Sequence, residues 1–281
     1  MKKILVPTNF SRASLAALKV AVAITKWDPN IQVRLAHSYH VHRHASVTNV
    51  DYGYDVPRQR KQVDEIHKKL NEIAKKDFVK GVKIETQVVP HLEVLDLLNY
   101  KDNKDTDLII CGIHGSNEGV SSIEGTHTEK IIRHAHCPVL CVHENIKEPI
   151  RFDDIVFASD FSRESLEVFP LLKKVFNALR AKIHLVKVIT PHNFENTPKS
   201  ENMMKDFAKK EYLTNYTIKV FNDETIELGI HRYAYSVNAN IIAMETHGYT
   251  GFIQLLKGSV TEAVALHSEL SVMSVKIPGK A

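Results

Sequence analysis

Four residues near the middle of the chain have the types and the spacing of a site that holds an anion. Gly112, Gly115, Gly125 and Thr126 follow the pattern G-x2-G-x9-G-[ST]. Glycine lets the backbone approach a phosphate closely, and a helix start offers unpaired N–H groups at the positive end of its dipole. An apolar run precedes the pattern and a helix-like run over residues 128–134 follows it, which predicts a strand, a glycine loop and a helix.

The same phrase returns near the C-terminus, where Gly248 is followed by Gly258 and Ser259. Glu245 stands at the position of the first glycine, so this copy departs from the pattern at one place. Two copies at a fixed separation indicate a repeated structural unit, whereas one copy of such spacing is a weak signal. The repeat therefore predicts a duplicated domain that carries an anion-binding loop in each half.

The beginnings of the two halves support the duplication. The phrase Phe-Ser-Arg-x-Ser-Leu occurs at residues 10–15 and again at 161–166, an offset of 151, whereas the glycine phrase repeats at an offset of 133. The second half is therefore shorter between these anchors, and we expect the missing length to lie after its second strand. The expected division is a first domain at 1–145 and a second at 150–281, joined by a short polar linker.

Apolar runs and helix-like periodicities alternate along each half. In the first half the expected strands are residues 3–8, 31–37, 82–89, 107–111 and 138–143, and the expected helices are one that starts at Ser11 and others at 58–78, 93–100 and 126–134. Alternating strands and helices predict an α/β fold with a mostly parallel, doubly wound sheet and helices on both faces. Ligands of such sheets bind beyond the carboxyl ends of the strands, where the strand order reverses.

Composition narrows the class of protein. The 281 residues are enough for two domains, and 43% of them are hydrophobic. No apolar run approaches the roughly 20 residues that cross a bilayer, so we expect no membrane partner. The net charge of +4 comes without a basic stripe, so we expect no nucleic-acid partner. Three cysteines form no disulfide framework, and a cytoplasmic location is expected.

Together these residues resemble the universal stress protein family in its tandem two-domain form. The resemblance covers essentially the whole chain and rests on residues 4–11, the two glycine phrases and residues 133–140. It implies two Rossmann-like (adenine nucleotide alpha hydrolase-like) domains, each with a five-stranded parallel sheet. It also implies pairing through the last strands, which in a tandem chain gives an intramolecular pseudo-dimer and leaves a further homodimer open. Some members of the family bind ATP or AMP, and others bind no nucleotide.

The family pattern implies which residues would touch an adenine nucleotide. An acidic residue after the first strand contacts adenosine, a residue just after the second strand packs on adenine, and the glycines with the final Ser or Thr hold the phosphates. In the first half the corresponding positions are Pro7, Thr8, Asn9, Ser38, Gly112, Gly115, Gly125 and Thr126. In the second half they are Asp160, Val188, Gly248, Gly258 and Ser259.

Each half departs from the family pattern. The first half has Asn9 in place of the acid, which keeps an acceptor oxygen, and Glu118 and Glu124 add negative charge to its loop. The second half keeps Asp160, but Glu245 adds a charged side chain where the backbone should approach phosphate. We therefore expect the first half to be the better nucleotide site. A tight turn without a ligand is the alternative explanation for the glycines, because turns also use positive φ.

Two histidine-rich clusters contain the residue types that bind zinc or copper. They consist of His37, His40, His42 and His44, and of His134, His136, Cys137, Cys141 and His143. The first lacks a Cys or carboxylate to complete a tetrahedral set, and alternation along the fifth strand would bury the cysteines of the second, so no metal is assigned.

No nucleophile elbow or P-loop occurs in the sequence, so no catalytic residue is assigned either. The leading interpretation is a stress-response protein that binds ATP or AMP in a regulatory or signalling role. A nucleotide-free scaffold that acts through protein–protein contacts is the second interpretation. A slow ATPase or metal-dependent hydrolase is the third, and whether the protein is an enzyme stays open.

Overall fold

The computed structural model describes residues 1–40, 56–91, 95–113, 127–246 and 270–277. The elements of the first half are β1 (Lys3–Pro7), α1 (Arg12–Thr25), β2 (Gln32–His40), α2 (Val56–Ala74), β3 (Ile84–His91), α3 (Leu95–Asn99), β4 (Leu108–Ile113), α4 (His127–His134) and β5 (Val139–His143). The elements of the second half are β6 (Asp154–Ala158), α5 (Arg163–Leu179), β7 (Lys182–Ile189), α6 (Thr197–Lys210), β8 (Tyr216–Asn222), α7 (Ile226–Ser236), β9 (Ile241–Thr246) and β10 (Ser271–Lys276).

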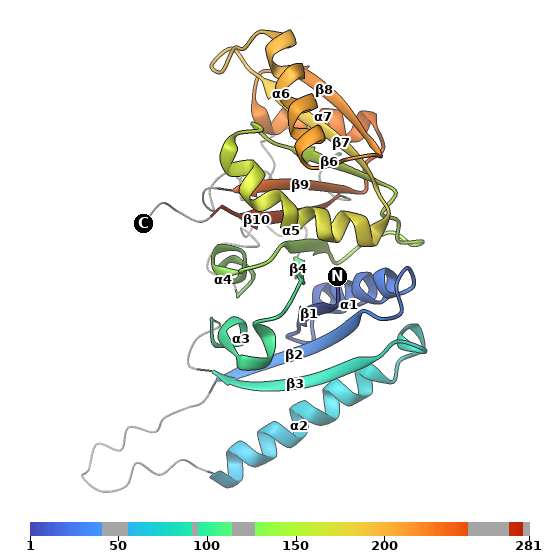
Figure 1. Cartoon of the computed structure of the whole chain (residues 1–281). Coiled ribbons are helices and arrows are strands. Elements are labelled where there is room, and N and C mark those ends of the chain that lie inside the picture. The colour runs from blue at the N-terminus through green and yellow to red at the C-terminus, as the bar shows by residue number, and fades with distance from the viewer. Residues whose placement is uncertain (41–55, 92–94, 114–126, 247–269, 278–281) are drawn as a thin grey trace, which may run out of the picture.

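All of these strands belong to one 10-stranded sheet with the order β3-β2-β1-β4-β5-β10-β9-β6-β7-β8. Within each half the five strands are parallel, and the order 3-2-1-4-5 is repeated in the second half. Figure 1 shows the first half, in blue to green, below the second half, in yellow to red. The predicted α/β fold of two five-stranded, Rossmann-like domains is confirmed.

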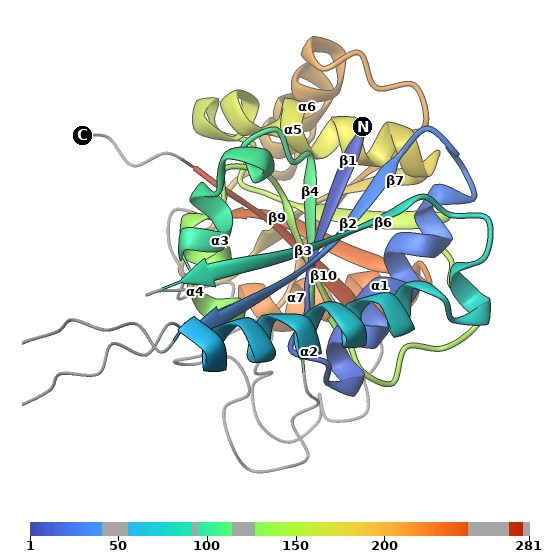
Figure 2. The ribbon, with the colours of Figure 1, turned by 90° about the horizontal axis from the view of Figure 1, so that it is seen from below.

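Hydrophobic side chains alternate between the two faces of the sheet, because successive residues of a strand point to opposite sides. In β1, Ile4 and Val6 face one core and Leu5 faces the other. The core of Ile4 and Val6 lies under α1, α2, α5 and α6, and the core of Leu5 lies under α3, α4 and α7. Both cores run through both halves. The view in Figure 2 shows how the strands fan out as the sheet twists.

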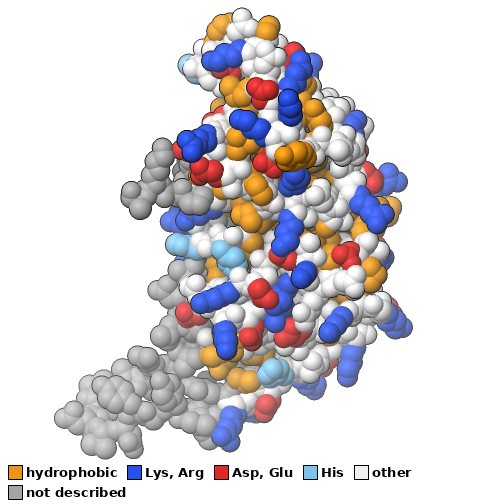
Figure 3. All heavy atoms as spheres, in the orientation of Figure 1, with side chains coloured by type: hydrophobic (Ala, Val, Ile, Leu, Met, Phe, Trp, Pro, Cys, Tyr) orange, Lys and Arg blue, Asp and Glu red, His pale blue; other side chains and the backbone are white. Residues whose placement is uncertain are grey.

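The two halves meet where their last strands pair. β5 and β10 are antiparallel, and Leu140 lies opposite Met273 in the completely buried centre of the pair. A contact farther from this seam also joins the halves, since Lys174 of α5 makes an ion pair with Asp107, which precedes β4. Among the described residues, no helix is both long and apolar enough to cross a membrane. Figure 3 shows basic and acidic side chains interspersed over the face of the molecule that it draws.

The difference in length between the halves lies where the sequence predicted it. β2 and β7 begin at Gln32 and Lys182, which are 150 residues apart. β3 and β8 begin at Ile84 and Tyr216, which are 132 residues apart. The first half therefore carries its extra residues between its second and third strands. β2 itself continues to His40, which corrects the expectation that the second strand ends at residue 37.

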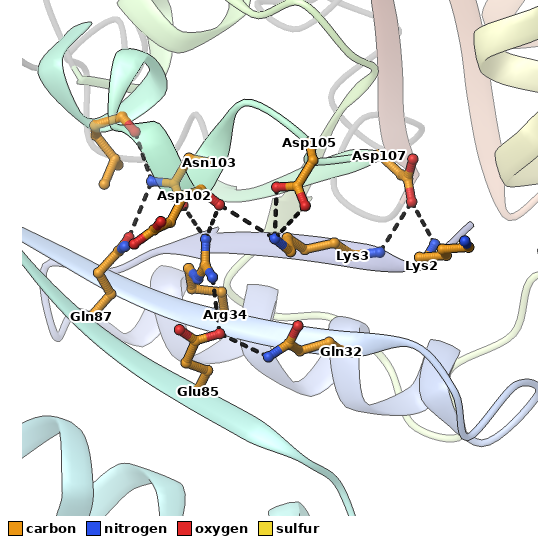
Figure 4. Close-up of polar contacts among 11 residues, drawn as sticks. Lys2, Lys3, Gln32, Arg34, Glu85, Gln87, Asp102, Asn103, Asp105 and Asp107 are labelled. Carbon is orange, nitrogen blue, oxygen red and sulfur yellow. Dashed lines mark hydrogen bonds and ion pairs between the residues drawn. The ribbon is translucent and has the colours of Figure 1, made fainter.

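Polar contacts fix the amino-terminal edge of the first half (Figure 4). The buried Arg34 of β2 donates to Asn103 Oδ1 over 2.8 Å and to Glu85 Oε2 of β3 over 2.9 Å. Lys3 Nζ lies 2.6 Å from Asp105 Oδ1 and so ties β1 to the turn before β4. These side-chain contacts hold β1, β2, β3 and the turn before β4 in fixed relative positions. The carboxyl ends of the same strands, at the opposite edge of the sheet, are therefore held in place as well.

Candidate functional site

The strand order defines two equivalent places where a ligand of this fold class can bind. In the first half the order reverses between β1 and β4, whose carboxyl ends lie side by side. In the second half it reverses between β6 and β9. The turn after β1 or β6 and the segment after β4 or β9 therefore form the walls of each candidate site.

In the first half, the turn after β1 is held by its own side chains. Thr8 Oγ1 accepts a hydrogen bond from the Phe10 backbone N–H over 3.0 Å and lies 3.0 Å from Ser14 Oγ. Asn9 Oδ1 accepts from the Ser11 N–H over 3.1 Å, and Ser11 in turn caps α1 by accepting from Ser14 N. The buried Thr8 thus fixes the turn, and the exposed Asn9 stands at the carboxyl edge.

The turn after β6 repeats this arrangement with an acidic residue. Asp160 Oδ1 accepts from the Ser162 N–H over 2.9 Å, as Asn9 Oδ1 does from Ser11, and Ser162 caps α5. An amide oxygen and a carboxylate oxygen are both acceptors, so the turn forms with either residue. The replacement of the acid by Asn9 therefore changes the charge of the site and leaves the backbone geometry of the turn intact.

Gly112 lies inside β4, one residue before its end, and faces the start of α1. A Cβ atom at this position would lie 2.6 Å from Ser14 N and closer still to the carbonyl group of Ala13. Such separations are shorter than van der Waals contact, so a side chain would force the strand and the helix apart. Among the described glycines only Gly81 has a positive φ. Close packing, not a turn conformation, is therefore what requires glycine at 112.

At the corresponding position of β9 the side chain of Glu245 occupies the space between strand and helix. Its Oε1 accepts hydrogen bonds from Ser159 Oγ and, over 2.6 Å, from Ser165 Oγ. Its Oε2 is buried and has no hydrogen-bond partner among the described residues. Burial is the main cause that raises the pKa of Glu245, the two serine hydrogen bonds oppose it, and the charge of Asp160 adds to the increase.

The sequence indicated that Glu245 would hinder the approach of phosphate, but it did not indicate the two serines that donate hydrogen bonds to Glu245. Ser159 and Ser165 are the counterparts of Thr8 and Ser14 at the offset of 151. In the first half those hydroxyls contact each other, whereas in the second half both also contact Glu245. The repeat offset was the signal that could have identified them. In the second half, the carboxyl group of Glu245 therefore lies between the end of β9 and the start of α5.

Comparisons with known proteins agree with this duplicated architecture. The model of the universal stress protein family matches residues 1–143 and again residues 151–276. The chain belongs to the universal stress protein family. A universal stress protein of Methanocaldococcus jannaschii is 30% identical over 155 residues, which cover 52% of this chain and 85% of the relative.

Solved structures of the family share the fold across the whole chain. A universal stress protein of Archaeoglobus fulgidus aligns with a TM-score of 0.70 and 16% identity, and the alignment covers 99% of both chains. A protein of unknown function from Pseudomonas aeruginosa aligns with a TM-score of 0.57 and 17% identity over 99% of this chain and 93% of the other. At such identities these structures support the tandem fold and not a particular ligand.

Two positions taken from the universal stress protein pattern lie elsewhere than expected. Ser38 and Val188 were expected just after the second strand of each half, but Ser38 pairs with Val89 inside β2 and Val188 pairs with Phe221 inside β7. Val188 is buried. β2 extends beyond its apolar run because β3 continues to supply backbone hydrogen-bond partners, whereas β7 ends on the apolar Ile189.

The loop residues of the family pattern fall outside the described residues. They are Gly115, Gly125, Thr126, Gly248, Gly258 and Ser259. Of the remaining candidates in the first half, Pro7 ends β1, Thr8 and Asn9 form the turn, and Gly112 lies in β4 beside them. The structure thus brings these four together at one edge of the sheet.

In the two histidine-rich clusters, the described side chains His37, Cys137 and Cys141 are hydrogen-bonded or packed against other parts of the fold. His37 Nδ1 lies 2.7 Å from the Thr8 carbonyl oxygen, and its ring packs on Phe10. Cys137 and Cys141 face the same core, as the strand alternation predicted. Burial raises the pKa of Cys137 to about 12 and that of Cys141 well above its ordinary value. Within the described residues, no group of three or more His, Cys, Asp or Glu could hold a metal ion.

Proposed function

We propose that the first half of this universal stress protein binds an adenine nucleotide, ATP or AMP, and that binding serves a regulatory role in the stress response. The packing of Gly112 against α1 carries this proposal. It brings the end of β4 within contact distance of the first turn of α1 and beside the Thr8–Asn9 turn. The end of β4, which the glycine pattern follows in the sequence, thus lies at the edge of the sheet that carries Asn9.

We propose that the second half does not bind nucleotide in the same way. Support comes from Glu245, whose carboxyl group contacts Ser159 and Ser165 at the end of β6 and the start of α5. A phosphate there would meet the buried side chain of Glu245 where the family pattern needs a free approach to backbone N–H groups. This asymmetry also favours a second candidate function, in which the second half acts as a scaffold through protein–protein contacts.

The remaining proposals concern the organisation of the chain. We propose domain boundaries at 1–145 and 150–281 and an intramolecular pseudo-dimer, which the antiparallel β5–β10 pair supports. A further homodimer and a cytoplasmic location also stay proposals. The buried thiols of Cys111, Cys137 and Cys141 are free, as a reducing compartment would keep them.

Nucleotide binding is tested by ligand release and thermal stability. Heat-denatured protein should release ATP or AMP that chromatography identifies, and added nucleotide should raise the melting temperature of the ligand-free protein. At a nucleotide concentration 100-fold above the dissociation constant, the gain in unfolding free energy is about 2.7 kcal/mol. The Gly115→Val variant should lose this gain, because the added side chain blocks backbone approach to phosphate.

Gly248→Val, the matched change in the second half, serves as the control and should keep the full nucleotide-dependent gain. If neither nucleotide raises the melting temperature of the unaltered protein and none is released, the proposal of nucleotide binding is wrong and the scaffold function is favoured. A gain that Gly248→Val abolishes and Gly115→Val leaves intact would assign binding to the second half instead.

A further inference from the structure

A hollow of about 950 Å³ lies at the opposite edge of the sheet from the candidate nucleotide site. Its walls come from the end of α1, the residues just after α2 and the segment 148–150 that joins the two halves. α1 follows the carboxyl end of β1 and runs back along the sheet, so its last turn reaches the amino-terminal edge. The hollow is therefore separate from the glycine loops, which follow the carboxyl ends of the strands.

Lysine side chains surround this hollow, and its acidic residues are already paired. Glu148 makes an ion pair of 2.8 Å with Lys19, and Asp77 makes one of 2.6 Å with Lys80. Lys26, Lys75 and Lys76 also line the hollow. Within the described part of the chain, no hydrogen bond or ion pair holds the ammonium groups of these three lysines. The hollow is thus lined by three exposed lysines, one just after α1 and two just after α2.

A lysine at a helix C-terminus is favourable by itself, because it faces the negative end of the helix dipole. That preference explains each lysine separately, but it does not explain why three lysines line the same hollow as apolar side chains. Val22, Phe78 and Ile150 also line the hollow, as does Trp27, which has 43% of its surface exposed. An exposed indole beside cationic groups provides a flat surface on which an aromatic ring can stack.

We propose that this hollow binds a small organic phosphate that carries a flat apolar ring. The ring would pack on Trp27 and Phe78, and the phosphate would lie among Lys26, Lys75 and Lys76. Lysine ammonium groups bind phosphate as point charges, and the hollow is of the size that small-molecule sites have. Glu148 is paired with Lys19 and also feels the charge of Lys26, and Asp77 is paired with Lys80. Lys75 and Lys76 therefore keep positive charge that favours an anion as the ligand.

The chain offers a built-in reporter for this site, since Trp27 is its one tryptophan. The probe is phenyl phosphate, which has a ring and a phosphate but no adenosine, so the proposed nucleotide site does not recognise it. Calorimetry should show saturable binding, and the fluorescence of Trp27 should change over the same concentration range. Phenol, which lacks the phosphate, and inorganic phosphate, which lacks the ring, should each bind at least about tenfold more weakly.

The decisive variant is the double substitution Lys75→Gln/Lys76→Gln, which should weaken phenyl phosphate binding at least about tenfold. The matched control is Lys209→Gln/Lys210→Gln, another pair of adjacent exposed lysines at the end of a helix, and it should bind as the unaltered protein does. Absence of binding by calorimetry, or equal loss in both double variants, would overturn the proposal. The Gly115→Val variant should bind phenyl phosphate normally, so the two proposals fail independently.

Discussion

At the scale of single residues, one position in the fourth strand of each half sets how that strand contacts the first helix of the half. Gly112 lets β4 contact the first turn of α1, and Glu245 at the equivalent position of β9 inserts a carboxyl group between strand and helix. Ser159 and Ser165 supply hydrogen bonds to Glu245 Oε1, while its Oε2 is buried without a partner among the described residues. A buried carboxyl group with one unpaired oxygen is held more easily with its proton than without it.

Replacing this carboxyl group by an amide should stabilise the protein at neutral pH. Burial raises the pKa of Glu245 above 4.5 in the folded state, so folding favours the protonated form. The free energy of unfolding should therefore fall as the pH rises from about 4.5 through the folded-state pKa. Glu245→Gln should remove this decrease and gain about 1 kcal/mol at neutral pH, as measured by urea unfolding at a series of pH values.

The exposed Glu224→Gln is the control for this experiment, because it removes one carboxyl group that is not buried. Its unfolding free energy should follow the pH dependence of the unaltered protein. A Glu245→Gln variant with the same pH dependence as the Glu224→Gln control would contradict the raised pKa of the buried Glu245.

At the scale of elements, the contact between β4 and α1 brings the candidate nucleotide site together. The Thr8–Asn9 turn enters α1 through the Ser11 cap, and the beginning of α1 lies on Gly112. The same turn and cap recur at Asp160 and Ser162 in the second half. The shared local sequence therefore builds the same β–turn–α unit twice, and only the facing strand differs.

A methyl group at position 112 should separate the two elements. Gly112→Ala places its Cβ 2.6 Å from Ser14 N, and relief of such overlap costs about 1–3 kcal/mol in well-packed cores. We expect a loss of about 2 kcal/mol or more in unfolding free energy, measured by denaturant titration. Glu245→Ala introduces the same residue at the equivalent position of β9, where the native side chain already has a Cβ. This variant should change stability by about 1 kcal/mol or less. Equal losses in both variants would contradict the packing explanation.

At the scale of the whole molecule, the halves form one sheet and share both hydrophobic cores. Pairing of β5 with β10 removes an open edge from each half, and exposed edges promote aggregation. The ion pair of Lys174 with Asp107 connects α5 of the second half to the amino-terminal edge of the first. Asp107 also accepts hydrogen bonds from the backbone N–H groups of Lys2 and Lys3, so this carboxylate joins three segments.

The Lys174–Asp107 ion pair should make part of the stability depend on pH at the acid side. Burial opposes the charge of Asp107, but the hydrogen bonds from Lys174 and from the Lys2 and Lys3 backbones outweigh it and hold its pKa below 3.8. The contribution of Asp107 is thus present above about pH 3.8 and is lost as the pH falls through its folded-state pKa. Lys174→Ala should lower the unfolding free energy at neutral pH by about 1 kcal/mol or less, since Lys174 is 48% exposed.

This pH dependence is tested by thermal unfolding followed by circular dichroism, at pH values from neutral to pH 3. The lowest pH is about one unit below the ordinary pKa of an Asp carboxyl group. The difference between Lys174→Ala and the unaltered protein should shrink as the pH falls. Lys210→Ala, at an exposed lysine of α6 in the second half, is the control and should show no such trend. A difference that stays constant down to pH 3 would exclude the charge of Asp107 as its source.

The sequence by itself determined the duplication, the α/β class and the order of elements, because hydrophobic periodicity and a motif repeated at two fixed offsets are properties of the chain alone. It also located the extra length between the second and third strands. It placed the ends of the second strands too early, before Ser38 and before Val188, which lie inside β2 and β7. A strand extends as far as a neighbouring strand pairs with it, and the neighbouring strand is distant in the sequence. Strand ends are therefore set by the assembled sheet.

Only the tertiary structure explained why glycine stands at 112, since the reason is the backbone of Ala13 and Ser14, about 100 residues earlier in the chain. Only it showed that Glu245 accepts hydrogen bonds from Ser159 and Ser165, and that Lys26, just after α1, and Lys75 and Lys76, just after α2, line one hollow with Trp27. Each of these features arises from groups far apart in the sequence. Local patterns indicate which residues can do chemistry, and packing decides which of them meet.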